Sequence, residues 1–580
     1  MSPAPSPAPA YARLRATGAT RATRVLALAA LSATLAACGS SHPSGTSVDP
    51  ATAVPASARL YAGATVRPGG AEKDAALSAA KALTGQADPY LRLVAALQTP
   101  GSPTLSFSHD VAPWLGTHAG VFLSSLRSAG ALSALVEQGL LGGTGGESAP
   151  FPFGASAAQG AIVLDTSDAA KASAFLDRQA AHAGAHRSSY RGVAYRTGSG
   201  GVAFGLVDRL AVIGSESALR SVIDTSLGGP SLAHAAGYSK LLASAPSDAL
   251  AHLYSNPPAS GPSSGAGAEG LSGTIGLLTA SRQANVSLVP SSTALTLDAD
   301  TIASGSSAVA GLLSSDPEGA AALSALPGDS WLAIGLGHVA ANLGSDVRAL
   351  RALTSLGGSG GASGSLSIKS LLDGLLTPLN ALGAETAQAA RDYRSWMGSA
   401  GIFASGGSLL ELKGAVVIGS NDPDRSRAAV AKLAAQLRSG GASLRPVSIP
   451  GTEAAVGVAV SGLPVVLDIA AGRGSDGHSR FVLALGEASV TAALSPSSTL
   501  SAAAPRNAAA AALGDGIQPS LIVDFPTLLS LLEGVGVTEE PGISRLVPYL
   551  RAATTLAGGG HSLGAGVERL RIVLGLHQSG

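Results

Sequence analysis

The sequence predicts an α+β protein with two tandem homologous domains, each a largely antiparallel sheet with packed helices. Three observations predict this fold class. A set of apolar segments recurs in the same order, capped helices follow some of these segments, and other strand-like runs follow each other without a helix between them. Adjacent strands such as "GVAYRTG" (192–198) and "GVAFGLVD" (201–208) favour antiparallel pairing over a doubly wound parallel sheet.

The chain begins with a basic segment that leads into an apolar run. Residues 1–24 contain four arginines and no acidic residue, and the 13 residues from Val25 to Ala37 carry no charge. A basic start and an apolar run of roughly 7–15 residues are typical of a secretory signal. The run is shorter than the roughly 20 residues that a membrane-spanning helix needs. We therefore expect residues 1–37 to be a signal peptide.

The only cysteine of the chain, Cys38, directly follows this run. The order Leu35, Ala36, Ala37, Cys38 resembles the lipobox of bacterial lipoproteins. The resemblance implies cleavage between Ala37 and Cys38, a diacylglycerol with acyl chains such as palmitate on the Cys38 thiol, and a protein anchored at the extracytoplasmic face of the cell membrane. An ordinary secretory signal with a chance cysteine is the alternative. One cysteine cannot form a disulfide within the chain.

The composition of the remaining chain limits its function. Residues 38–54 begin with the cysteine expected to carry the lipid. The residues after it are rich in small and polar types, which predicts a flexible tether. Removal of residues 1–37 takes away four of 37 Lys and Arg and none of 37 Asp and Glu, so the mature chain is slightly acidic. We expect no nucleic-acid binding from an exported chain without a basic patch. The aromatic content of 4% counts against a carbohydrate-binding module.

The repeated segments define the domain organisation. In both halves, apolar strands run into Ser, Asp or Glu residues that would cap a following helix. The matched pairs are 55–66 with 327–339, 113–122 with 396–403, 161–176 with 415–433, 210–223 with 481–494, 249–257 with 520–526, and 293–302 with 568–577. We therefore expect a first α+β domain at 55–305, a linker at 306–321 and a second domain at 322–578.

Several of these segments resemble a family of exported bacterial proteins known as domain of unknown function 3352. The residues that carry the likeness are "PASARLYAGATV", "HDVAPWLGTHAGVF", "FGLVDRLAVIGSESALRSVID", "SLAHAAGYSKLLASAPSDALAHLY" and "LPGDSWLAIGLGHV". The resemblance implies an exported, often anchored protein. The family has no established activity, so the resemblance implies no catalytic residue.

Two stretches match the serine-hydrolase pattern G-x-S-x-G, with Ser263 and Ser359 at the nucleophile position. That motif requires a sharp turn from a strand into a helix, but both copies lie in Gly- and Ser-rich segments. "GRGSDG" (472–477) has the glycine spacing of a dinucleotide site, but a strand follows it where a helix is needed. We interpret it as a hairpin turn, and we expect no catalytic residue and no cofactor.

Metal-like patterns have simpler explanations. His182 and His186 are four residues apart, but Gly184 lies between them near the end of a helix expected from about Asp168, and no third ligand is near. Asn421, Asp422 and Asp424 lack the glycine and distal glutamate of a calcium loop, so we expect them to cap a helix. We expect no metal site.

Trp114 and Trp396 occupy matched places in the two halves, as do Leu60 and Trp331 approximately, which predicts core packing.

The function that follows is a membrane-anchored lipoprotein that is not an enzyme. We expect a non-catalytic binding module of the cell envelope, with a protein partner or an apolar lipid ligand, anchored through the diacylglycerol on Cys38. The alternatives are an envelope hydrolase with dispersed catalytic residues and a structural spacer.

Overall fold

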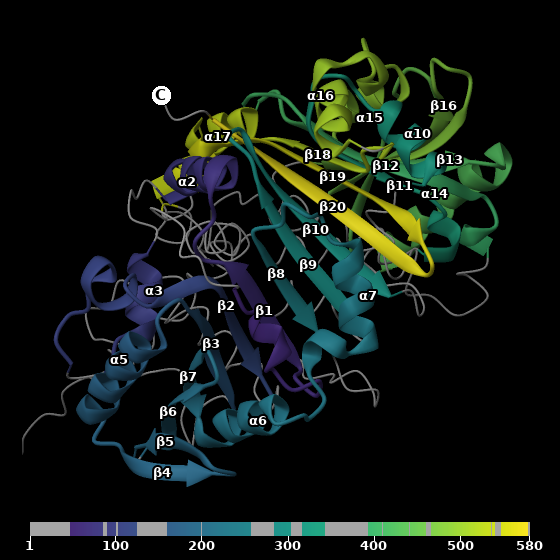
Figure 1. Ribbon diagram of the computed structural model, residues 1–580. Coiled ribbons are helices and arrows are strands. Elements are labelled where there is room, and N and C mark those ends of the chain that lie inside the picture. Colours follow the sequence, from purple (N-terminus) through teal and green to yellow (C-terminus); the bar gives the residue numbers. More distant parts are fainter. Residues whose placement is uncertain are drawn as a thin grey trace, which may run out of the picture.

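The structure is a computed structural model of the 580-residue chain (Figure 1). It describes residues 47–84, 90–99, 102–124, 159–198, 200–256, 283–302, 316–342, 392–408, 410–439, 441–459, 466–514, 516–534, 536–539, 544 and 547–577. The expected signal peptide, Cys38 and most of the linker at 306–321 lie outside these residues.

The described residues form one sheet of twenty strands. The strands of the N-terminal half are β1 (Leu60–Thr65), β2 (Leu115–Leu123), β3 (Gly160–Thr166), β4 (His186–Tyr190), β5 (Val193–Thr197), β6 (Val202–Val207), β7 (Leu210–Ser215), β8 (Ala251–Ser255), β9 (Ala284–Pro290) and β10 (Ala294–Ile302). Those of the C-terminal half are β11 (Ser330–Leu336), β12 (Met397–Ser405), β13 (Lys413–Ser420), β14 (Ser443–Pro446), β15 (Thr452–Ala459), β16 (Val466–Arg473), β17 (Ser479–Leu485), β18 (Leu521–Asp524), β19 (Ala553–Gly564) and β20 (Val567–Leu576).

All pairings in the sheet are antiparallel, and each half has the same strand order. The first half runs β4-β5-β6-β7-β3-β2-β1-β8-β9-β10. The second half runs β14-β15-β16-β17-β13-β12-β11-β18-β19-β20. The last strands of the halves, β10 and β20, pair with each other from Ala294 opposite Gly575 to Ile302 opposite Val567. This pairing joins the halves into one sheet.

The α+β class and the antiparallel sheet expected from the sequence are therefore confirmed. The expectation of a separate sheet in each domain is wrong, because both halves belong to a single sheet. The physical reason is the pairing of β10 with β20. Each of these strands forms hydrogen bonds with backbone N–H and C=O groups of the other that would otherwise be unpaired at an open sheet edge.

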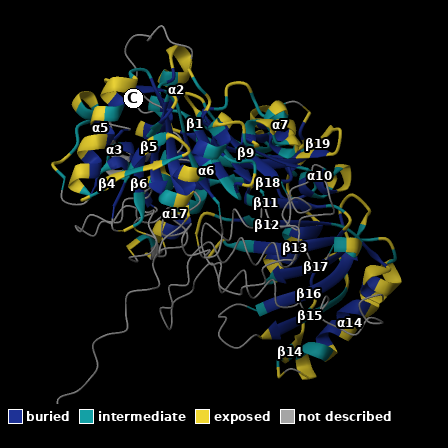
Figure 2. Cartoon of the chain, turned by 60° about the horizontal axis from the view of Figure 1, so that its bottom comes forward, coloured by how far each residue is buried: buried dark blue, intermediate teal, exposed yellow. Residues whose placement is uncertain are grey.

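Helices cover both faces of the sheet, and their outer surfaces are exposed while most of the strands are buried (Figure 2). The helices of the first half are α2 (Gly70–Thr84), α3 (Leu91–Leu97), α5 (Ala169–His182), α6 (Glu216–Ser226) and α7 (Ala236–Ser244). Those of the second half are α10 (Pro317–Ser324), α14 (Pro423–Ser439), α15 (Glu487–Leu494), α16 (Ala504–Leu513), α17 (Phe525–Gly534) and α18 (Val547–Ala552).

Each face of the sheet has apolar packing in both halves, as one cluster of buried side chains in each half. One face carries α6 and α7 in the first half and α10, α15 and α16 in the second. The other carries α5 and α14, on which the matched tryptophans pack as expected. Trp114 lies 5.0 Å from Phe175, and Trp396 lies 5.2 Å from Phe481, measured between ring centroids. Both tryptophans are buried.

The helix starts follow the expected caps. The Asp168 carboxylate accepts a hydrogen bond from the Lys171 backbone N–H (3.0 Å), and Asp422 does the same for Arg425 (3.1 Å). Glu216 and Glu487 are the first residues of α6 and α15, where the positive end of the helix dipole favours a carboxylate. These local signals place α5, α6, α14 and α15.

The folded part begins earlier than the sequence predicted. Residues 47–54, expected in the flexible tether, are part of the fold: Asp49 caps a short 3-10 helix at Pro50–Thr52, and Ala51 and Val54 are buried in the core under α6 and α7. Apolar burial explains this difference, because small residues such as alanine fit a core as well as a tether.

Candidate functional site

A band of polar side chains crosses the middle of the sheet on the face that carries α7 and α16. Cross-strand partners from β8, β9, β10, β20 and β19 form two neighbouring rows. The first row consists of Tyr254, Asn285, Asp300, Arg569 and His561. The second row consists of His252, Ser287, Asp298 and Arg571, and it ends at Gly559, which has no side chain. Polar groups buried in a core are costly unless they are hydrogen-bonded, so this band is a candidate functional site.

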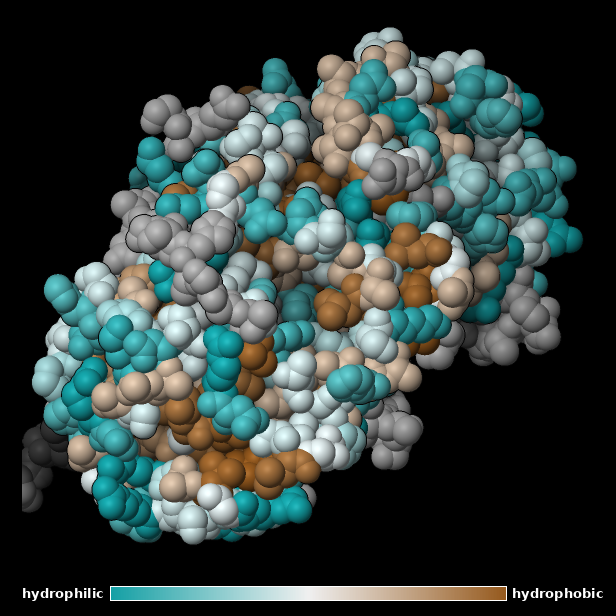
Figure 3. All heavy atoms as spheres, viewed as in Figure 1, coloured by the Kyte–Doolittle hydropathy of each residue, from teal (hydrophilic) through white to brown (hydrophobic). Residues whose placement is uncertain are grey.

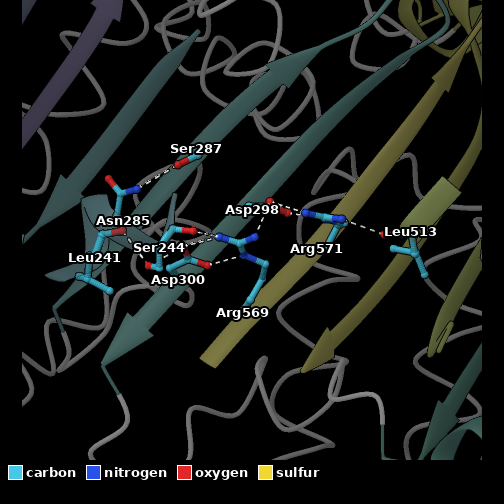
Figure 4. A network of polar contacts seen from close by, with 9 residues as sticks. All are labelled: Leu241, Ser244, Asn285, Ser287, Asp298, Asp300, Leu513, Arg569 and Arg571. Carbon is cyan, nitrogen blue, oxygen red and sulfur yellow. Dashed lines mark hydrogen bonds and ion pairs between the residues drawn. The ribbon is translucent and has the colours of Figure 1, made fainter. Parts of the chain in front are cut away.

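The centre of the band is a group of four charged residues that join β10 to β20 (Figure 4). Nε and Nη2 of Arg569 donate to the two oxygens of Asp300, at 2.7 and 2.8 Å. Arg571 makes the same two-point contact with Asp298, at 2.7 and 2.8 Å. Arg569 also lies 3.4 Å from Asp298. We call Asp298, Asp300, Arg569 and Arg571 the charged seam.

The arginines of the charged seam also reach the ends of two helices. Arg569 donates to the Ser244 carbonyl at the end of α7, and Arg571 donates to the Leu513 carbonyl at the end of α16 (2.9 Å). The last carbonyls of a helix lack partners within the helix and carry partial negative charge, so they suit a guanidinium. Each arginine thus binds both the opposite strand and a helix.

This arrangement suits a structural role. Asp298 and Asp300 are fully buried and Arg569 is 9% exposed, so the charges are withdrawn from water. The hydrogen bonds from Arg569 to Asp300 raise the pKa of the guanidinium. Each carboxylate is held in two charge-assisted hydrogen bonds, so the charged groups of the seam bind one another.

A second polar group lies beside the seam, where His252 of β8 faces α7. Its Nε2 is 2.9 Å from the Tyr238 hydroxyl, and the Tyr61 and Tyr254 rings pack edge-on against Tyr238. Burial lowers the pKa of His252 to about 4, so the imidazole is neutral near pH 7 and can accept the tyrosine hydrogen. Tyr238 is buried and His252 is half-buried, so this pair lies mostly inside the core.

Asp468 of β16 is a buried carboxylate, and neither of its oxygens has a hydrogen-bond partner among the residues that the structure describes. Its neighbour across the strand pair is Gly457, and the next strand places Arg445 opposite the same glycine. The Arg445 side chain lies over Gly457 but points toward Glu487, at 4.0 Å. Burial raises the pKa of Asp468 to about 6; Arg445 opposes this shift and Glu487 adds to it.

One group of possible metal ligands lies at the start of α10. Ligand atoms of Asp316, Glu318 and His338 lie within 4.8 Å of one another. Asp316 already caps the helix through the Glu318 backbone N–H (3.1 Å) and contacts Nδ1 of His338 with its other oxygen. The helix N-terminus next to it disfavours a cation, so we assign no metal to this group.

The other candidates from the sequence do not come together in a site. His182 ends α5 and His186 begins β4, so the two are not on one helix face. The segment 472–477 is a hairpin turn between β16 and β17, closed by Gly474 N–H donating to the His478 carbonyl (2.8 Å). Ser263, Ser359 and the lipobox residues Leu35–Cys38 lie outside the described residues.

The charged seam is a feature that the sequence-based expectations do not include. Its signal is visible in the matched final strands, where Asp-x-Asp in "TLDADTI" faces Arg-x-Arg in "ERLRIVL". Alternating like charges in a strand that is otherwise apolar indicate a buried ionic partner, because water cannot solvate them there.

We predict that Asp300→Asn destabilises the protein by about 3 kcal/mol, because it leaves the buried Arg569 without its negative partner. Urea unfolding of the full chain measures this loss. Asp177→Asn is the matched control: it breaks the Arg196–Asp177 pair, whose carboxylate is 53% exposed, and should cost less than about 1 kcal/mol. Equal, small losses in both variants would contradict a structural role for the seam.

We predict that Asp468 makes the protein less stable as pH rises. Its pKa is raised in the folded state, so the folded form favours the proton, and the stability present below about pH 4 is lost as pH passes through about 6. This preference of the folded form for the protonated carboxyl is worth at most about 3 kcal/mol. Asp468→Asn should therefore be at least as stable as the parent at pH 8, with a flatter stability profile from pH 4 to 7. A less stable variant with an unchanged profile would refute this.

Among the described residues, no helix has both the length and the apolar character needed to cross a membrane. The sequence matches the family model described as "Protein of unknown function (DUF3352)" over residues 22–534, which is more than half of the chain. No curated protein and no solved structure matches the chain. The chain therefore belongs to the DUF3352 family, the family that its strand and turn segments resemble.

Proposed function

We propose that the protein is a lipoprotein anchored at the extracytoplasmic face of the cell membrane through a diacylglycerol on Cys38. The observation that carries this proposal is the order of residues 25–38, an apolar run that ends in Leu35-Ala36-Ala37-Cys38. Two acyl chains give stable membrane binding where one does not. The first residue that the structure describes, Ser47, comes nine positions after Cys38 in the sequence.

We infer that the two halves are tandem homologous domains that arose by duplication and then shared one sheet. The identical order of strand pairing in β1–β10 and β11–β20 supports this. So do the isolated bridges at equivalent places, Pro55 with Ser231 and Pro327 with Thr499. The final strands have diverged in charge, with aspartates in β10 and arginines in β20. Halves with complementary charges at their joint favour pairing with each other over pairing with themselves.

We propose that the folded part is a non-catalytic binding module of the envelope. Its continuous sheet is a rigid platform, and the polar groups in its centre bind each other. Hydrophobic side chains reach the surface over α6 and over the central strands (Figure 3). Leu227 at the end of α6 is 51% exposed and Leu563 in β19 is 37% exposed. Exposed apolar surface of this kind suits a protein partner or an apolar lipid ligand.

We predict that Cys38→Ala moves the protein from the membrane fraction to the soluble fraction and abolishes incorporation of labelled palmitate, because the variant lacks the thiol that takes the lipid. Cell fractionation and metabolic labelling measure the two effects. Ser40→Ala, two residues away, is the control and should fractionate like the parent.

If Cys38→Ala stays in the membrane with its label, the anchor is not at Cys38. The released Cys38→Ala protein also tests the binding role. A stoichiometric lipid in its native mass spectrum would favour an apolar ligand, and a mass without one would favour a protein partner.

A further inference from the structure

The chain enters the fold at a fixed point on the first half. The backbone N–H of Val48 donates to Oδ1 of Asp165 at the end of β3 (3.3 Å), and Oδ2 of the same carboxylate accepts from the Thr117 N–H of β2 (3.0 Å). Asp165 is buried, and the Val48 side chain packs against the core under α6 and α7. Ser47 is therefore held beside the start of β2 and the end of β3.

The distance between this point and the proposed anchor is short. Eight residues lie between Cys38 and Ser47, which makes nine steps along the chain, so the two residues are at most about 32 Å apart. A chain of this length without fixed structure would average about 17 Å. The lipid anchor therefore keeps the start of β2 and the end of β3 close to the bilayer.

The equivalent point of the second half lies far away. From β3 to β13 there are eleven steps between neighbouring strands, which at about 4.8 Å each amount to about 50 Å. Figure 1 accordingly shows α5 and α14, the helices that follow these strands, at opposite ends of the molecule.

We propose that the end of the first half formed by the last residues of β3, the start of α5 and the β6–β7 turn faces the lipid surface, and that α14 points away from it. This orientation rests on the proposed anchor at Cys38. The β6–β7 turn belongs to the same surface, because Arg209 donates to the Thr166 carbonyl (3.1 Å) and accepts from the Thr166 N–H (3.0 Å). Asp208 in this turn is exposed.

The two halves offer a matched pair of positions for the test. Lys171 in the first turn of α5 is 61% exposed and pairs with the cap residue Asp168. Arg425 in the first turn of α14 is also 61% exposed and pairs with the cap residue Asp422. Since Cys38 is the only cysteine and its thiol carries the lipid, Lys171→Cys and Arg425→Cys each provide a single reactive thiol.

The experiment uses full-length lipidated protein in phosphatidylcholine–phosphatidylglycerol vesicles that contain a headgroup-quenching lipid. Each variant carries the same fluorophore on its new thiol, and quenching and cosedimentation are measured on the same samples. We expect quenching at Lys171→Cys to be on the order of threefold stronger than at Arg425→Cys, because the tether holds only the first position within reach.

The outcomes separate this inference from the anchor on which it rests. Cosedimentation with equal quenching, or with stronger quenching at Arg425→Cys, would overturn the orientation and leave the anchor standing. Protein that does not cosediment would overturn both. Cosedimentation with stronger quenching at Lys171→Cys would support both.

Discussion

The two-point ion pairs between β10 and β20 are the constraint on which the rest of the structure depends. They are the place where the halves of the chain meet through backbone pairing, and their charges are buried. A buried ion pair adds little net stability compared with apolar residues, but it is costly to break. Its main effect is therefore on specificity. A slip of two residues in either direction would leave one of the two aspartates opposite a valine, Val573 or Val567, so the charged seam favours the observed register between β10 and β20.

The joint also explains why the halves share their cores. Val567 of β20 packs in the core of the first half under α6 and α7, while Ala299 of β10 packs in the core of the second half around Trp396. Leu295 and Leu574 lie in a third cluster that joins α2 to α17. Each final strand thus completes the core of the other half. Because the halves share their cores, the position of the tethered first half also determines the position of the second half.

Local features of the fold could be predicted from the sequence because their causes are local. Asp168 and Asp422 stand just before the helices that they cap, so the starts of these helices could be predicted. Trp114 and Trp396 recur at matched places in the two halves, so their positions in the core could be predicted too. The hairpin at 472–477 could be predicted because a strand-like segment comes directly after the glycine pattern. In each case the deciding residues lie within a few positions of the element that they determine.

Long-range features could not be predicted in the same way. The joint between β10 and β20 pairs residues about 270 positions apart, and no local pattern shows which strand edge is open; only the Asp-x-Asp and Arg-x-Arg pairs hint at it. Ala51 and Val54 are buried although their segment resembles a linker, since small residues are compatible with both. The sequence around Asp468 does not show that its carboxylate is buried. The burial results from the packing of strands β14 to β17, which lie apart in the sequence.

Hydrogen exchange of the full chain, followed by mass spectrometry at increasing urea concentrations, tests the central claim most directly. If the charged seam joins the halves into one structural unit, the amides of β10 and β20 exchange only through the opening that also exposes the cores around Trp114 and Trp396, with one shared free energy and one urea dependence. If one half exchanges through its own unfolding while the other half and both joint strands stay protected, the halves are independent domains and the account is wrong.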